Sequence, residues 1–85
     1  VDMKTMKEEK YNGWANYETW NIALWIENDE GLYNMAKEYR RQGYKAFAES
    51  LRELGGAIAI ETPDHVSWSD SGLDIEALDE MIAEL

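Results

Sequence analysis

Apolar residues recur at helical spacing in four segments of this 85-residue chain. Spacings of three and four residues place them on one side of a helix. They predict a mainly α fold, a compact bundle of about four helices over residues 17–28, 30–42, 44–54 and 75–85. Residues 57–69 break this pattern and are expected to be extended, with room for a short β pair. Residues 1–10 are expected to be a disordered lead-in to a single helical domain, residues 11–85.

Short polar residues and glycines mark the ends of the predicted helices. Asn and Asp side chains placed before a helix accept hydrogen bonds from its first free backbone N–H groups. We expect such N-caps from Asn16, from Asn28 or Asp29, and from Asp74. Gly43 is expected to follow the second helix as its C′ residue, and the pair Gly55–Gly56 to end the third.

The first predicted helix is apolar nearly all round, which is typical of a central element. One stripe holds Tyr17, Trp20, Ala23 and Leu24, and a second holds Ile22, Trp25 and Ile26. We expect Trp20 to lie at the centre of the core. Trp25 joins the core if the other helices cover the second stripe, and otherwise contacts a partner. Trp14 either packs over the helix N-terminus or stays open to a partner, since Trp is enriched at binding hot spots.

The charged residues are distributed unevenly. The chain has 18 acidic and 8 basic residues and a net charge of −10. Residues 61–85 contain no Lys or Arg but carry the acids Glu61, Asp64, Asp70, Asp74, Glu76, Asp79, Glu80 and Glu84. Such a surface repels phosphate backbones and attracts basic proteins, so direct nucleic-acid binding is not expected. These acids either keep a small protein soluble or imitate a phosphate backbone.

Composition also bears on the cellular compartment. The chain has no cysteine, which fits a reducing cytoplasm and leaves neither disulfides nor thiolate zinc sites. Its longest apolar run, Ile22–Ile26, is far shorter than the ~20 residues that span a bilayer. Residues 1–10 lack the apolar region of a signal peptide. We therefore expect a soluble cytoplasmic protein with no membrane partner.

The sequence offers little catalytic chemistry. His65 is the single histidine, and the nearby Ser67 and Asp70 are too close in sequence to converge with it as a triad. The aspartates at 64, 70 and 74 do not follow the spacing of a calcium loop, and glycine-rich phosphate-binding motifs are absent. We expect no enzymatic activity, no catalytic residue, no metal and no cofactor.

One segment carries a distinctive motif. The segment from Tyr11 to Tyr33 contains NYETWNIALW at residues 16–25. It resembles a family of small, largely uncharacterised proteins with an N-Y-E-T-W-N-x-A-L-W motif, which occur in bacteriophages, plasmids and some bacteria and archaea. The C-terminal PDHVSWSDSGLDIEALDEMI is similar in style to the ends of these proteins. The resemblance implies a mobile-element setting and transfers no catalytic or binding residue.

Together these features predict an acidic, non-enzymatic protein-binding inhibitor from a mobile element. It would occlude, or imitate nucleic acid at, a basic nucleic-acid-binding surface of a host enzyme, in an anti-defence role. The alternative is a protein-interaction or assembly module that uses the aromatic helix. The residues expected to bind the partner are Trp14, Trp25, Glu61, Asp64, Asp70, Asp74, Glu76, Asp79 and Glu80.

Overall fold

The computed structural model describes residue 11 and residues 13–85, and this part of the chain is mainly helical. It contains four α-helices and one 3₁₀ turn: α2 (Tyr17–Asn28), α3 (Glu30–Glu38), α4 (Tyr44–Leu54), η1 (Ala57–Ala59) and α5 (Ile75–Ala83). The predicted fold class is confirmed. The prediction for residues 1–10 lies outside the described residues.

The predicted N-caps are present. The side chain of Asn16 accepts from the Thr19 backbone N–H at 2.9 Å, which starts α2. Asp29 starts α3 in the same way, and Asp74 starts α5 through the Ala77 N–H. These contacts span three residues, so they form wherever the local backbone turns into a helix. Local sequence therefore fixes where these helices begin.

Two helices end earlier than predicted. α3 stops at Glu38, not at residue 42, because Tyr39 caps it and residues 39–42 form a turn closed by the Gly43 N–H on the Tyr39 carbonyl. Gly43 is thus not the C′ residue of α3. It is the N-cap of α4, at a φ of 97° that suits glycine. α5 ends at Ala83, with Glu84 at its C-cap.

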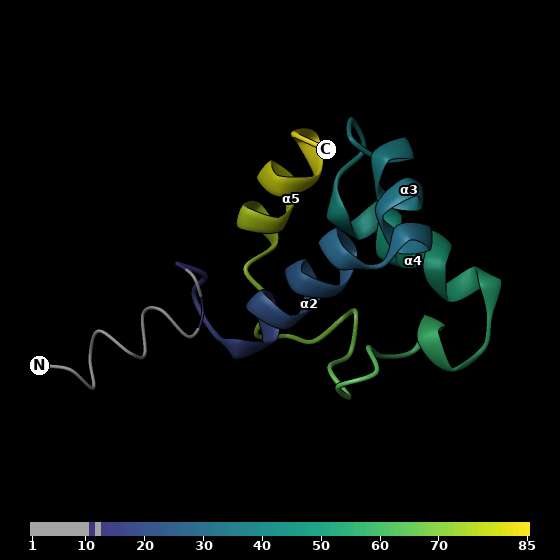
Figure 1. Ribbon diagram of the computed structural model, residues 1–85, viewed down its shortest axis with the longest axis horizontal. Helices are drawn as coiled ribbons and strands as arrows, with labels where there is room; N and C mark the ends of the chain where they lie inside the picture. Colours follow the sequence, from purple (N-terminus) through teal and green to yellow (C-terminus); the bar gives the residue numbers. More distant parts are fainter. Residues whose placement is uncertain (1–10, 12) are drawn as a thin grey trace, which may run out of the picture.

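The segment between α4 and α5, residues 55–74, is a crossover that runs along α2 (Figure 1). The short β pair considered for residues 57–69 is reduced to one antiparallel bridge between Glu61 and Ser67. Ala57–Ala59 forms the 3₁₀ turn instead of extended chain. The Thr62 N–H donates to the Val66 carbonyl at 2.8 Å, which closes a tight turn around residues 63–65.

The core has a different tryptophan at its centre from the one predicted. Trp20 is only half-buried and lies against Tyr17, with ring centroids 5.7 Å apart. Trp68, from the crossover, is 2% exposed and meets Phe47 edge-on at 6.0 Å. The indole N–H of Trp68 donates to the Ile58 carbonyl, and its own carbonyl accepts from the Tyr44 hydroxyl. The expectation for Trp20 is wrong because the crossover supplies the central ring.

The buried face of α2 explains this difference. Its buried residues are Thr19, Asn21, Ile22, Ala23 and Ile26. Four of them, residues 19, 22, 23 and 26, have the i, i+3, i+4, i+7 spacing of one helix face. Neither of the two predicted apolar stripes includes Thr19, and the stripe with Trp20 was the one expected at the centre of the core. Thr19 can occupy the buried face because its hydroxyl accepts the Asp74 backbone N–H at 3.0 Å.

Candidate functional site

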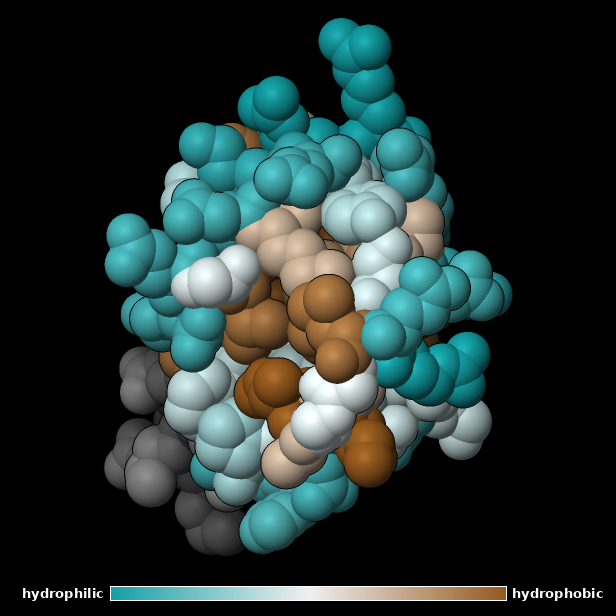
Figure 2. Space-filling view, turned by 90° about the vertical axis from the view of Figure 1, so that its right-hand side faces the viewer, coloured by the Kyte–Doolittle hydropathy of each residue, from teal (hydrophilic) through white to brown (hydrophobic). Residues whose placement is uncertain are grey.

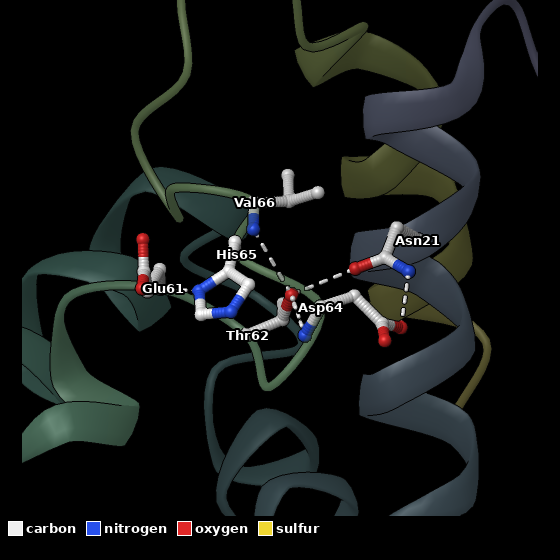
Figure 3. Close-up of polar contacts among 6 residues, drawn as sticks. All are labelled: Asn21, Glu61, Thr62, Asp64, His65 and Val66. Carbon is white, nitrogen blue, oxygen red and sulfur yellow. Dashed lines mark hydrogen bonds and ion pairs between the residues drawn. The ribbon is translucent and has the colours of Figure 1, made fainter.

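Asn21 connects α2 to the crossover through a buried polar network (Figure 3). Its side-chain oxygen accepts from the Thr62 hydroxyl at 2.8 Å, and its side-chain nitrogen donates to the Asp64 carboxylate at 2.8 Å. The Thr62 hydroxyl oxygen in turn accepts the backbone N–H groups of Asp64 and Val66. This network holds the tight turn of residues 62–66 against α2.

Two predicted partner-binding residues, Trp25 and Asp64, form a hydrogen bond with each other. The indole N–H of Trp25 donates to the same Asp64 oxygen that accepts from Asn21, at 2.9 Å. The Asn21 amide, followed by the Trp25 indole, lowers the pKa of Asp64 below its usual value. Trp25 is half-buried against the core, and its stripe neighbours Ile22 and Ile26 are fully buried. The second stripe of α2 is therefore largely covered by the chain itself.

Four more of the predicted acids also bond within the chain. Asp70 accepts the Gly72 N–H at 2.7 Å, and Asp74 caps α5. Asp79 accepts the Tyr44 N–H at 2.6 Å and so supplies, from α5, the N-terminal cap that Gly43 cannot give to α4. Glu61 contacts the imidazole Nδ1 of His65 at 2.8 Å. The predicted acidic cluster is thus not a single array.

His65 lies on the tight turn, far from a catalytic arrangement. Its side chain is 81% exposed, and its backbone has a φ of 70°, which is unusual for a residue with a Cβ. Glu61, by its hydrogen bond and its charge, raises the pKa of His65. Ser67 and Ser69 share a hydrogen bond with each other and none with His65. The geometry is that of a solvated loop histidine paired with a carboxylate.

The remaining predicted acids, Glu76 and Glu80, project from α5 into solvent. Glu84, at the α5 C-cap, continues the row at the same spacing of four residues, which places successive side chains on one side of a helix. Within residue 11 and residues 13–85, none of these three carboxylates has an ion-pair or hydrogen-bond partner. They form an uncompensated acidic row.

Trp14 lies next to this row. It is half-buried and lines a shallow groove of about 390 Å³ with Ala77, Glu80, Met81 and Glu84. The structure thus places two predicted partner-binding residues, Trp14 and Glu80, on one groove, with Glu76 one turn before Glu80 on α5. We call Trp14, Glu76, Glu80 and Glu84 the α5 face.

A third surface was not predicted. Leu54 and Ile60 are 71% and 69% exposed, and Ile58 is 37% exposed. Apolar side chains gather in the middle of the face that contains the end of α4 and η1, with polar side chains around them (Figure 2). Ile60 also lines an open groove of about 550 Å³, whose lining extends to Trp68. The signal was visible in the sequence, since residues 54–60, LGGAIAI, form an uncharged run in a highly charged chain.

The described residues give no indication of a metal centre or a membrane span. No group of three or more His, Asp or Glu side chains among them is arranged to hold a metal ion. None of the described helices combines the length and the apolar character that crossing a bilayer requires.

Comparison with known families places almost the whole chain in one of them. A family of unknown function, DUF7249, matches residues 7–85, and the chain belongs to this family. The expectation of an uncharacterised family is confirmed at this level. No curated protein and no solved structure matches the chain.

Proposed function

We propose that this member of the DUF7249 family is a non-enzymatic module that binds a basic protein surface through its α5 face. The observation that carries the proposal is the row of Glu76, Glu80 and Glu84 beside the half-buried ring of Trp14. Aromatic anchors supply apolar contact area at interfaces, and unpaired carboxylates supply long-range attraction to cations.

The acidic row has a cost to the isolated protein. Like charges four residues apart destabilise a helix by roughly 0.2–0.5 kcal/mol per pair. α5 contains no Lys or Arg that would offset this repulsion, and its last turn has no basic residue. A partner with a cationic surface would remove the repulsion on binding. The row is therefore better suited to a complex than to the free chain.

The α5 face supports binding better than the aromatic helix does. The Trp25 nitrogen is already bonded to Asp64, and Ile22 and Ile26 have no exposed surface to offer. The five basic residues of the described chain all lie between residues 37 and 52, on α3, α4 and the turn between them. The chain after residue 52 therefore contains no Lys or Arg, so the segment that includes α5 has no basic residue of its own to weaken its attraction for a cationic partner.

The finer proposal concerns origin and partner. The NYETWNIALW motif resembles proteins of bacteriophages and plasmids, so we propose a mobile-element protein that acts in the host cytoplasm. Its partner would be a host nucleic-acid enzyme, such as a component of a defence nuclease. The spaced carboxylates of α5 would occupy the phosphate-binding surface of that enzyme and exclude its nucleic acid, which makes the module an inhibitor.

Affinity capture from a native host lysate tests the proposal. The bait is the full chain, compared with the variant Glu76→Gln/Glu80→Gln/Glu84→Gln. A matched control, Glu27→Gln/Glu30→Gln/Glu38→Gln, removes three exposed charges from α2 and α3. We expect a basic nucleic-acid-binding protein to bind the wild type and the control, to be lost with the α5 variant, and to be released by salt. Equal loss with both variants, or capture that salt does not weaken, would contradict the α5 face.

A further inference from the structure

We infer that Leu54, Ile58 and Ile60 form a self-association surface, and that its occupant is a second copy of this chain. We call these three residues and the adjoining groove the α4–η1 surface. It is separate from the α5 face in composition, because its exposed centre is apolar and uncharged. The inference does not depend on the proposed function.

The exposure of these side chains is the first step. Leu54 is the last residue of α4, and Gly55–Gly56, both at positive φ, turn the chain so that Ile58 and Ile60 follow on the adjoining η1 segment. Leu54 and Ile60 remain 71% and 69% exposed, although burial of their apolar surface would be favourable by about 25 cal/mol per Å². An exposed apolar patch beside a groove marks an interaction site more often than a chance exposure of single residues does.

The charges around the surface indicate which partner fits. The exposed side of α4 next to it carries two cations and two anions: Lys45, Arg52, Glu49 and Glu53. This balance is unusual in a chain with a net charge of −10. Two copies of a strongly acidic protein repel each other over most approaches. On the α4 side of the α4–η1 surface that repulsion is reduced, because each copy offers both signs there.

A two-fold contact uses this mixture directly. In such a contact the same patch serves both copies, so each interaction occurs twice. Arg52 of one copy can then face Glu49 or Glu53 of the second copy, and the reverse. A purely acidic or purely basic partner would leave one sign unmatched. The surface is therefore complementary to itself.

The groove supplies the receiving half of the contact. Ile60 lines the groove together with Lys45 and Arg52 of α4, and the nearly buried side chains of Trp68 and Leu73 lie along its lining. At about 550 Å³, the groove is large enough for an aliphatic side chain. Leu54, the most exposed large apolar residue, is the side chain that would enter the groove of the second copy. Asp70, also on the lining, has its carboxylate bonded to the Gly72 N–H.

Sedimentation equilibrium of the full chain over a wide concentration range tests the inference. We expect a monomer–dimer equilibrium for the wild type. Leu54→Asp and Ile60→Asp should each weaken the dimer about 100-fold, because the change is made twice and each buried charge costs about tenfold or more. Both positions are exposed, so circular dichroism should show an unchanged helix content.

Two controls make the result specific. Asn34→Asp adds the same charge at an exposed position of α3 and should leave the dimer within a few-fold of the wild type. The variant Glu76→Gln/Glu80→Gln/Glu84→Gln should retain the dimer, which separates this test from that of the proposed function. A wild type that stays monomeric at its solubility limit, a dimer unaffected by both Asp variants, or an open-ended series of oligomers would overturn the inference.

Discussion

The side chain of Asn21 reaches across 43 residues of sequence to donate to the Asp64 carboxylate at 2.8 Å. Asn21 is fully buried, whereas Asp64 lies on the exposed turn of the crossover. Two further side chains connect α2 to the segment that precedes α5. The Thr19 hydroxyl accepts from the Asp74 N–H, and the Asn16 amide donates to the Gly72 carbonyl. Polar residues of the NYETWNIALW motif thus hold two distant parts of the chain together.

Replacing Asn21 should loosen this connection. Asn21→Ala removes the acceptor of the Thr62 hydroxyl and a donor to Asp64, and we expect it to lower the free energy of unfolding by about 1–3 kcal/mol. Urea unfolding followed by circular dichroism measures the change. Asn34→Ala makes the same substitution at an exposed position of a helix and should stay within about 0.5 kcal/mol of the wild type. Equal effects at both positions would mean that the network adds no stability.

The Thr19 hydroxyl offers a test confined to one hydrogen bond. Thr19→Val keeps the shape of the side chain but leaves the Asp74 N–H without its acceptor, at an expected cost of about 1–2 kcal/mol. Thr19→Ser retains the hydroxyl and should preserve the bond. Amide hydrogen exchange reports the bond directly. Exchange at Asp74 should accelerate in the Val variant and not in the Ser variant, and unchanged protection in both would contradict the contact.

The two tryptophans should respond differently to truncation. Trp68→Ala leaves a cavity at the centre of the core and should lower the free energy of unfolding by about 3–5 kcal/mol. This is a large share of the total stability of a small domain. Trp20→Ala removes a half-buried ring packed on Tyr17 and should cost less than half as much. Thermal unfolding of the two variants side by side checks the order. A larger loss of stability in Trp20→Ala than in Trp68→Ala would contradict the central position of Trp68.

His65 should titrate above its ordinary pKa because Glu61 stabilises the protonated ring. A pKa raised by folding means that the contribution of this pair to stability is full below the unfolded pKa of about 6.5. That contribution is lost as the pH rises through the higher folded pKa. Proton NMR titration of the imidazole gives the value directly. Glu61→Gln should bring it down toward 6.5, and an unchanged value would show that the pair does not form in solution.

Asp64 should shift in the opposite sense. The Asn21 amide and the Trp25 indole favour its charged form, so its pKa lies below 3.8 and its contribution to stability is lost as the pH falls through that lowered value. In Asn21→Ala the pKa of Asp64 should rise. Carbon-detected NMR titration of the carboxyl group measures the change. An unchanged pKa of Asp64 in this variant would contradict the contact.

The sequence by itself determined the local features of this protein. The helix starts follow from caps that act over three residues, as at Asn16 and Asp74, and α4 has the predicted bounds because its apolar spacing and the Gly55–Gly56 pair are local signals. The separation of acidic and basic residues along the chain was also predictable, because charged residues can be counted from the sequence without knowing their contacts. The end of α3 was predicted wrongly because helical spacing does not show that the Gly43 N–H closes a turn on the Tyr39 carbonyl.

Only the tertiary structure decided which residues are buried and which are free. α2 has two apolar stripes of similar strength, and the choice between them depends on Thr19 and Asn21, which become buriable only when the crossover supplies partners 41 to 55 residues away. The same long-range contacts bring Trp68 into the core in place of Trp20, and bond Asp64 and Asp79 within the chain. They leave Glu76, Glu80 and the large apolar residues of the α4–η1 surface exposed. A polar side chain can be buried only where hydrogen-bond partners lie next to it in the folded chain. The pattern of apolar and polar residues along the sequence does not show those partners.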